Sequence, residues 1–133
     1  MGKFGVVAIM AGLAFGSGAM GGDMPKDVYK AEKDRIEGEY KAGKTRCDSL
    51  AGNAKDICLA EAKGRKESGE TDLEARYEPS KENRSKAAGA KAEADYAVAK
   101  EKCDDQAGDA KDICLEEAKA AEASAKADAK RLN

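Results

Sequence analysis

The chain has 133 residues, of which 24 are lysine or arginine and 26 are aspartate or glutamate, and it contains no histidine and no tryptophan. The formal net charge is −2 and the two signs are finely interspersed, which argues against nucleic acid and against a polybasic membrane patch. Because histidine is the usual general base near neutral pH and the commonest metal ligand, its absence removes many catalytic and metal-site designs.

The N-terminal segment has the layout of a secretory signal peptide. A short basic start, Met1–Lys3, precedes the uncharged apolar run Phe4–Phe15 and then several small residues. That run is too short for a bilayer-spanning helix, which needs about 20 residues. Ser17 and Ala19 satisfy the small-x-small cleavage rule, so we expect residues 1–19 to be removed and the rest to be exported without a membrane span. The alternative, a buried helix of a cytosolic protein, would need a core that the polar remainder does not offer.

The exported part contains one motif twice. CDSLAGNAKDICLAEAK at residues 47–63 recurs as CDDQAGDAKDICLEEAK at residues 103–119. Each copy predicts a helix, a tight turn and a second helix, with one cysteine on either side of the turn. Pro79 separates the copies, so we expect a first helical hairpin over residues 20–78 and a second over residues 79–133.

The turn of each copy carries helix-capping signals. Gly52 is expected to end the first helix in left-handed geometry, and Asn53 to cap the next helix. Asp56 stands where a capping box places an acid, which also suits the helix dipole. The second copy repeats the scheme with three equivalent residues, Gly108, Asp109 and Asp112.

The chain's four cysteines lie at matching heights on the arms of the predicted hairpins. An exported compartment is oxidising, and an even number of cysteines there favours disulfides. We therefore expect the bridges Cys47–Cys58 and Cys103–Cys114, each worth on the order of 3 kcal/mol through the short loop that it closes. Pairing between the hairpins is the alternative. Both C-x-x-C redox chemistry and a zinc site fit poorly, because ten residues separate the cysteines of each pair.

The rest of the pattern is helical, without a strand signal. The first helix is expected after Pro25, on apolar positions at heptad-like spacing: Tyr29, Ile36, Tyr40, Cys47 and Leu50. The second is expected over about 54–77, frayed or bent at Gly64 and Gly69, because glycine weakens a helix by about 1 kcal/mol against alanine.

The second half repeats this organisation. Ser80 is expected to cap a third helix that reaches about residue 106, and a fourth helix runs from about residue 110 to Arg131 with a frayed end. Most apolar positions are alanine, so the core is thin. The chain is therefore predicted to be all-α, with two tandem disulfide-stapled hairpins arranged as a small four-helix bundle or as an extended helical pair.

Little in the sequence points to chemistry. The paired acids Asp104-Asp105 and Glu116-Glu117 are interpreted as a solvated face, because adjacent helical residues point in different directions. Tyr40 and Tyr96 are expected to pack at the seam under the disulfides. We assign no catalytic, cofactor-binding or metal-binding residues, and we expect a protein that is not an enzyme.

The doubled cysteine motif, together with KDVYKAEKDRIEGEYK after the signal segment, resembles a group of small exported Ala/Lys-rich proteins of Gram-negative bacteria, some labelled TolA-like or cell-envelope. The resemblance implies a periplasmic setting and no catalytic residues. We therefore expect a non-enzymatic periplasmic helical protein with a structural, stress-related or partner-binding role, acting on an unknown envelope protein or through self-association. A thiol-disulfide or metal-handling protein and a holdase-type chaperone are the alternatives.

Overall fold

The computed structural model describes residues 24–133, so the expected signal peptide lies outside the described residues. Four helices make up this part: α1 (Lys26–Cys47), α2 (Gly52–Tyr77), α3 (Lys81–Cys103) and α4 (Gly108–Lys130), and residues 24–133 contain no strand. The prediction of an all-α chain is confirmed. No helix within this range is both long and apolar enough to cross a bilayer.

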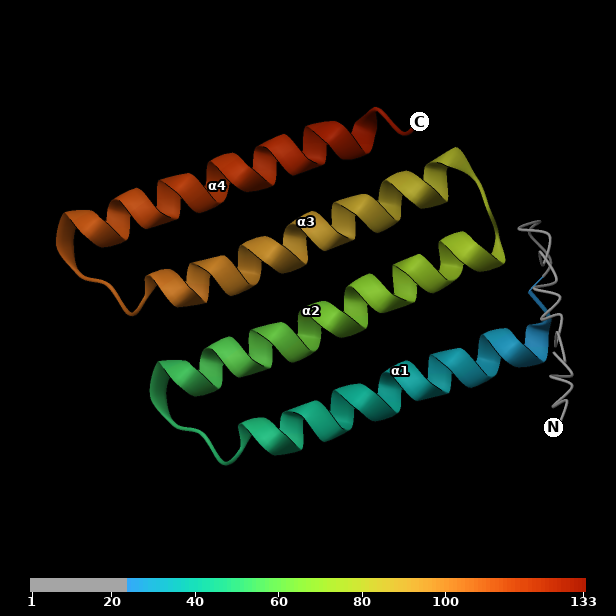
Figure 1. Cartoon of the computed structure of the whole chain (residues 1–133), viewed down its shortest axis with the longest axis horizontal. Helices are drawn as coiled ribbons and strands as arrows, with labels where there is room; N and C mark the ends of the chain where they lie inside the picture. The colour runs from blue at the N-terminus through green and yellow to red at the C-terminus, as the bar shows by residue number, and fades with distance from the viewer. Residues whose placement is uncertain (1–23) are drawn as a thin grey trace, which may run out of the picture.

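The helices lie side by side in chain order and form a layer one helix thick (Figure 1). Each helix contacts the next one along the chain, whereas α1 and α4 have no contact and form the two edges. The chain thus consists of two disulfide-stapled hairpins that pack against each other through α2 and α3. A bundle closed by α1 and α4 is not formed.

The helix boundaries follow local signals. Ser80 caps α3 as predicted, since its hydroxyl accepts a hydrogen bond of 2.9 Å from the backbone N–H of Asn83. α2 ends at Tyr77, two residues before Pro79, as predicted, because the residue that precedes a proline disfavours helical geometry. α3 ends earlier than predicted, at Cys103, and α4 begins earlier, at Gly108. α4 remains helical to Lys130, where a frayed end was expected.

The register between α1 and α2 is set by three contacts along the hairpin. Cys47 is bonded to Cys58, a side chain on Gly43 would meet the Cβ of Ala62 at 3.3 Å, and a side chain on Gly69 would meet Ile36 at 3.6 Å. Residues that ascend α1 are therefore paired with residues that descend α2, as an antiparallel hairpin requires. The expectation that Gly69 interrupts α2 is wrong, because the helix is continuous through this residue, which packs at an ordinary distance from Ile36.

A second glycine of α2, Gly64, faces α3. It is buried, and a Cβ added there would lie 3.0 Å from the Cβ of Ala94 and 3.6 Å from its Cα. A small residue is required because the backbones of α2 and α3 approach closely at this point. The helix-propensity penalty that predicts a bend at Gly64 is overridden by this tertiary contact.

The core consists mainly of alanine and cysteine. The largest fully buried side chains of the described part are Leu73, Cys47 and Cys103. The same four repeat positions are buried in both hairpins, but the second hairpin has alanine where the first has Ile36 and Leu73. These pairs are Ile36 with Ala92, Cys47 with Cys103, Ala62 with Ala118, and Leu73 with Ala129.

The close approach at Gly64 predicts opposite outcomes for two glycines. Replacing Gly64 with leucine forces Ala94 and the α3 backbone away, so we expect the free energy of unfolding to fall by about 1–3 kcal/mol. Gly38→Ala meets nothing within 4 Å, and we expect a gain of up to about 1 kcal/mol from helix propensity. Urea unfolding of both variants measures the two changes, and equal effects would contradict the role assigned to Gly64.

Candidate functional site

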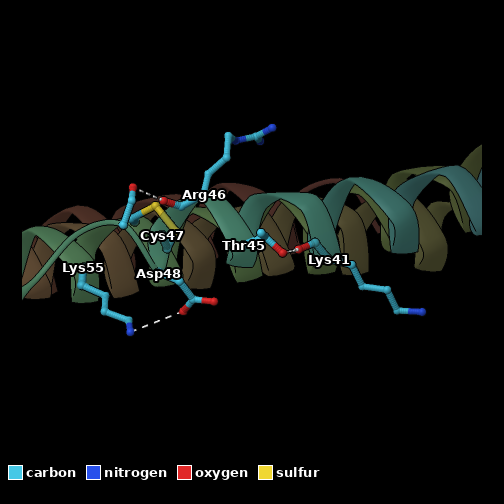
Figure 2. The surroundings of a disulfide bond; sticks show 8 residues. Lys41, Thr45, Arg46, Cys47, Asp48 and Lys55 are labelled. Atoms are coloured by element: carbon cyan, nitrogen blue, oxygen red, sulfur yellow. Dashed lines mark hydrogen bonds and ion pairs between the residues drawn. A yellow bond between two sulfur atoms is a disulfide. The ribbon is translucent and has the colours of Figure 1, made fainter.

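The two bends are closed by disulfides. Cys47 is bonded to Cys58 and Cys103 to Cys114, with a Cα–Cα distance of 5.6 Å in each pair. The surroundings of the first bond are shown in Figure 2. Cys47 and Cys103 are 0% exposed, and Cys58 and Cys114 are half-buried. The pairing within each hairpin agrees with the spacing, and none of the cysteines within residues 24–133 is free.

An ion pair accompanies each bridge. Lys55 Nζ lies 3.4 Å from a carboxylate oxygen of Asp48 (Figure 2), and Lys111 Nζ lies 2.8 Å from the equivalent Asp104. The hydrogen bond to Asp104 raises the pKa of Lys111. These pairs join the end of one helix to the start of the next on the solvent side. Lys55 and Lys111, each three residues before the second cysteine of its bridge, are therefore paired with an acid of the same bend.

The turn residues are arranged differently from the prediction. Gly52 and Gly108 do have the expected left-handed backbone, with φ of +59° and +60°, but each begins the second helix of its hairpin. α1 has already ended at Cys47 and α3 at Cys103. In the tight turns that follow, the backbone N–H groups of Leu50 and Gln106 donate to the carbonyls of these cysteines at 3.0 Å. The left-handed glycines instead turn the chain into the returning helix.

The expected side-chain caps are absent from both bends. The N-cap positions are Ala51 and Ala107, and neither α2 nor α4 has a side-chain cap bond. The amide of Asn53 donates instead to the backbone carbonyl of Glu101 in α3, at 2.7 Å. Asn53 therefore joins the two hairpins. The expected acids of the capping scheme lie within the helices, Asp109 in the first turn of α4 and Asp56 and Asp112 further along.

Tyr40 and Tyr96 are the two tyrosines that were expected to pack under the disulfides. Tyr40 is half-buried, with the ammonium groups of Lys44 and Lys66 each 4.9 Å from its ring centroid, and Tyr96 is also half-buried. Lys66 also pairs with Glu37 at 2.9 Å, and this hydrogen bond raises the pKa of Lys66 and lowers that of Glu37. Of the two lysines, Lys66 joins α2 to α1, whereas Lys44 belongs to α1 like Tyr40 itself.

The open end of the first hairpin is held by a second aromatic contact. Tyr29 stacks on Tyr77 with the ring centroids 4.2 Å apart, and its hydroxyl donates to Glu74 at 2.8 Å. This hydrogen bond, with burial, raises the pKa of Tyr29. The second hairpin has Ser85 in place of Tyr29, bonded to the amide of Asn133 at 3.3 Å. The first hairpin is therefore fastened at both ends, and the second mainly at its disulfide.

One acid of each adjacent pair is bonded to a lysine. Glu116 lies 3.0 Å from Lys119, and Asp104 is taken up by Lys111. Residues 24–133 contain no group of three or more potential metal-ligating side chains.

A groove lies between α1 and α2. It has a volume of about 380 Å³, and its lining includes five basic residues against two acids, Glu39 and Asp72. The basic residues are Arg35, Arg46, Arg65, Lys66 and Arg76. Within the described chain, Arg46, Arg65 and Arg76 make no ion pair, whereas Arg35 is bonded to Glu32 and Glu39. We call the four arginines with this groove the arginine groove.

The contacts of neighbouring residues give the order of the arginines along the groove. Arg46 precedes Cys47 at the bend, and Arg65 precedes Lys66, which lies over Tyr40. Arg35, which precedes Ile36, comes next, and Arg76, which precedes Tyr77, is last.

The four arginines therefore alternate between α1 and α2. When the arginines of α2 are projected onto α1 through the register of the hairpin, successive arginines are five or six residues apart, or about 8 Å at 1.5 Å per residue. A guanidinium binds carboxylate and phosphate oxygens through a planar pair of donors. Such a row fits a ligand that carries anionic groups at regular intervals.

The groove was missed from the sequence because the charges are mixed along the chain. One signal was available, since Arg35 and Arg46 are eleven residues apart, as are Arg65 and Arg76. Eleven residues are close to three helical turns, so each pair shares a helix face. The repeat gives a second signal, because the second hairpin has Lys91, Lys102, Ala121 and Leu132 at the equivalent positions.

The chain matches no family model, no curated protein and no solved structure.

The unequal fastening of the hairpins predicts that loss of a disulfide opens one hairpin locally more than the other. Replacing either cysteine pair with alanine should lower the free energy of unfolding by about 3 kcal/mol. Without Cys103–Cys114, however, α4 should open locally, because α3 and α4 bury mainly alanine. Hydrogen exchange should then speed up in α4 more than it does in α1 when Cys47–Cys58 is removed. The same protection of α1 and α4 in the two variants would contradict this asymmetry.

Proposed function

We propose that the chain is a non-enzymatic helical protein of the periplasm whose arginine groove binds an anionic component of the cell envelope. The observation that carries the proposal is the gathering of four arginines from α1 and α2 along one groove. The repeat provides a comparison within the chain, because the second hairpin keeps the fold and the disulfide without these arginines. Arginines in the first groove are thus not required by the hairpin architecture.

The disulfides support the choice of compartment. Structural disulfides persist in secreted and periplasmic proteins and are rare in the cytosol. The signal-like segment at residues 1–19 favours export as well. A role in binding also suits a layer with two broad faces, since its helices bury few side chains and leave the rest to contact a partner.

The groove's electrostatics predict a salt-dependent interaction that two arginines control. We expect the protein to co-sediment with purified peptidoglycan, which carries carboxylates, or with vesicles of phosphate-bearing envelope lipid. Arg46→Gln with Arg65→Gln should weaken that binding at least about tenfold, because each bidentate contact to an anion is lost. Added salt should weaken the wild type as well.

The matched control is Lys91→Gln with Lys102→Gln, which removes the same charge from the second hairpin. This variant should keep most of the binding. Equal losses in the two variants would show that net charge, rather than the groove, is responsible, and binding to neither material would contradict the proposal.

Export predicts the oxidation state of the cysteines in cells. Protein recovered from the periplasmic fraction and alkylated at once should lack residues 1–19 and show no reactive thiol, since both bridges are closed. After denaturation and reduction, four thiols should react, one for each cysteine. Reactive thiols or bound metal in the native sample would instead favour the thiol-disulfide or metal-handling alternative.

A further inference from the structure

The two hairpins pack against each other through a closely fitted seam between α2 and α3. Gly64 of α2 lies against Ala94 of α3, and the amide of Asn53 bonds the carbonyl of Glu101. Ala60 and Ala97 line one groove along this seam together with Gly64 and Ala94. Asp72 and Lys91 line the groove on the other side.

The internal repeat reproduces both halves of this seam at the edges of the molecule. α4 is the repeat equivalent of α2, so its free edge corresponds to the face of α2 that meets α3. α1 is the equivalent of α3, so its free edge corresponds to the face of α3 that meets α2. These edges are the two ends of the row of helices, α1 at one end and α4 at the other (Figure 1). A second copy placed beside the first could therefore continue the seam, with its α1 against the first copy's α4.

The residues at the two edges are complementary in size. Gly64 and Ala94 of the seam correspond to Ala120 on α4 and Gly38 on α1. The glycine and the alanine have exchanged sides, so one Cβ would again fill the crossing point. Gly38 has nothing within 4 Å of its Cβ position, and Ala120 is exposed, so both places are open.

The edges are also complementary in charge. The seam pair Ala60 and Ala97 corresponds to Glu116 on α4 and Lys41 on α1, two residues of opposite sign. The seam pair Asp72 and Lys91 corresponds to Asp128 and Arg35, which keeps the order of the signs. Both pairs place an acid on α4 opposite a base on α1.

One apolar residue on the α4 edge lacks the cover that its counterpart has. Ile57 lies seven residues before Gly64, on the same side of α2, and is half-buried. Its equivalent Ile113 is 59% exposed. A neighbouring helix at the α4 edge would cover Ile113 as α3 covers the corresponding side of α2.

We propose that this protein assembles head to tail, with α4 of one copy packed against α1 of the next in the geometry of the α2–α3 seam. Because the two surfaces of such a contact differ, the assembly does not stop at a dimer and forms a ring or an open row. Arg35 belongs to both surfaces, but the variants of the test lie outside the arginine groove and the test reads the state of association alone.

The crossing point supplies the first variant. We expect wild-type protein from the exported fraction to show a weight-average mass that rises with concentration in sedimentation equilibrium. Ala120→Arg should lower the association constant at least about tenfold, because a long charged side chain would stand where the backbones meet. Ala121→Arg is the matched control, since it adds the same side chain one residue away and copies Arg65 of the first hairpin. It should associate like the wild type.

The charge pair tests the direction of assembly. Lys41→Glu and Glu116→Lys should each weaken association by placing like charges in the contact. An equimolar mixture of the two variants should associate again, because every contact in an alternating row then has opposite charges. The helical signal and thermal melting of each variant confirm that the monomer is intact.

Three outcomes would overturn the proposal. The first is a wild type that remains monomeric at millimolar concentration, as it would if another chain or the N-terminal segment covered the edges. The second is association that Ala120→Arg leaves unchanged. The third is association of the wild type that stops at a dimer and is not recovered when the two charge variants are mixed, as expected for a symmetric contact.

Discussion

Covalent closure of the two bends is the constraint on which the layer depends. Among residues 24–133, Leu73 is the only large aliphatic side chain that is fully buried, so the hydrophobic contribution to folding is small. Folding costs conformational entropy, and a core of alanines does little to offset that cost. Each disulfide lowers the cost by restricting the unfolded chain. The bridge also keeps the two arms of a hairpin in register, so that the small residues further along face each other.

Small residues at the contacts are the second half of this solution. Gly43 and Gly64 let neighbouring backbones approach until alanine fills the space between them. A glycine within a helix has a cost in helix propensity, and here the packing that it permits outweighs that cost. The layer is therefore stabilised by close backbone approach, where a bundle of the same length would use large apolar side chains.

The sequence was sufficient to predict the helices, the hairpins and the cysteine pairing, because these depend on local patterns and on the spacing of the motif. It was less informative about the bends, where Asn53 resembles a helix cap but donates to Glu101 of another hairpin. Nor could it show that Gly64 serves a contact, because Ala94 lies thirty residues away along the chain. The arginine groove depends on the register of two antiparallel helices, which only the folded hairpin defines.

The thickness of the layer has a consequence for how such a protein can change in evolution. A globular domain that gains a segment must rebuild its interior around it. In a sheet of helices each hairpin touches only its immediate neighbours, so another unit could be duplicated into the row without disturbing the others. Length and binding surface could then be varied by whole hairpins, and a duplicate could lose or acquire a groove while its fold is kept by the cysteines.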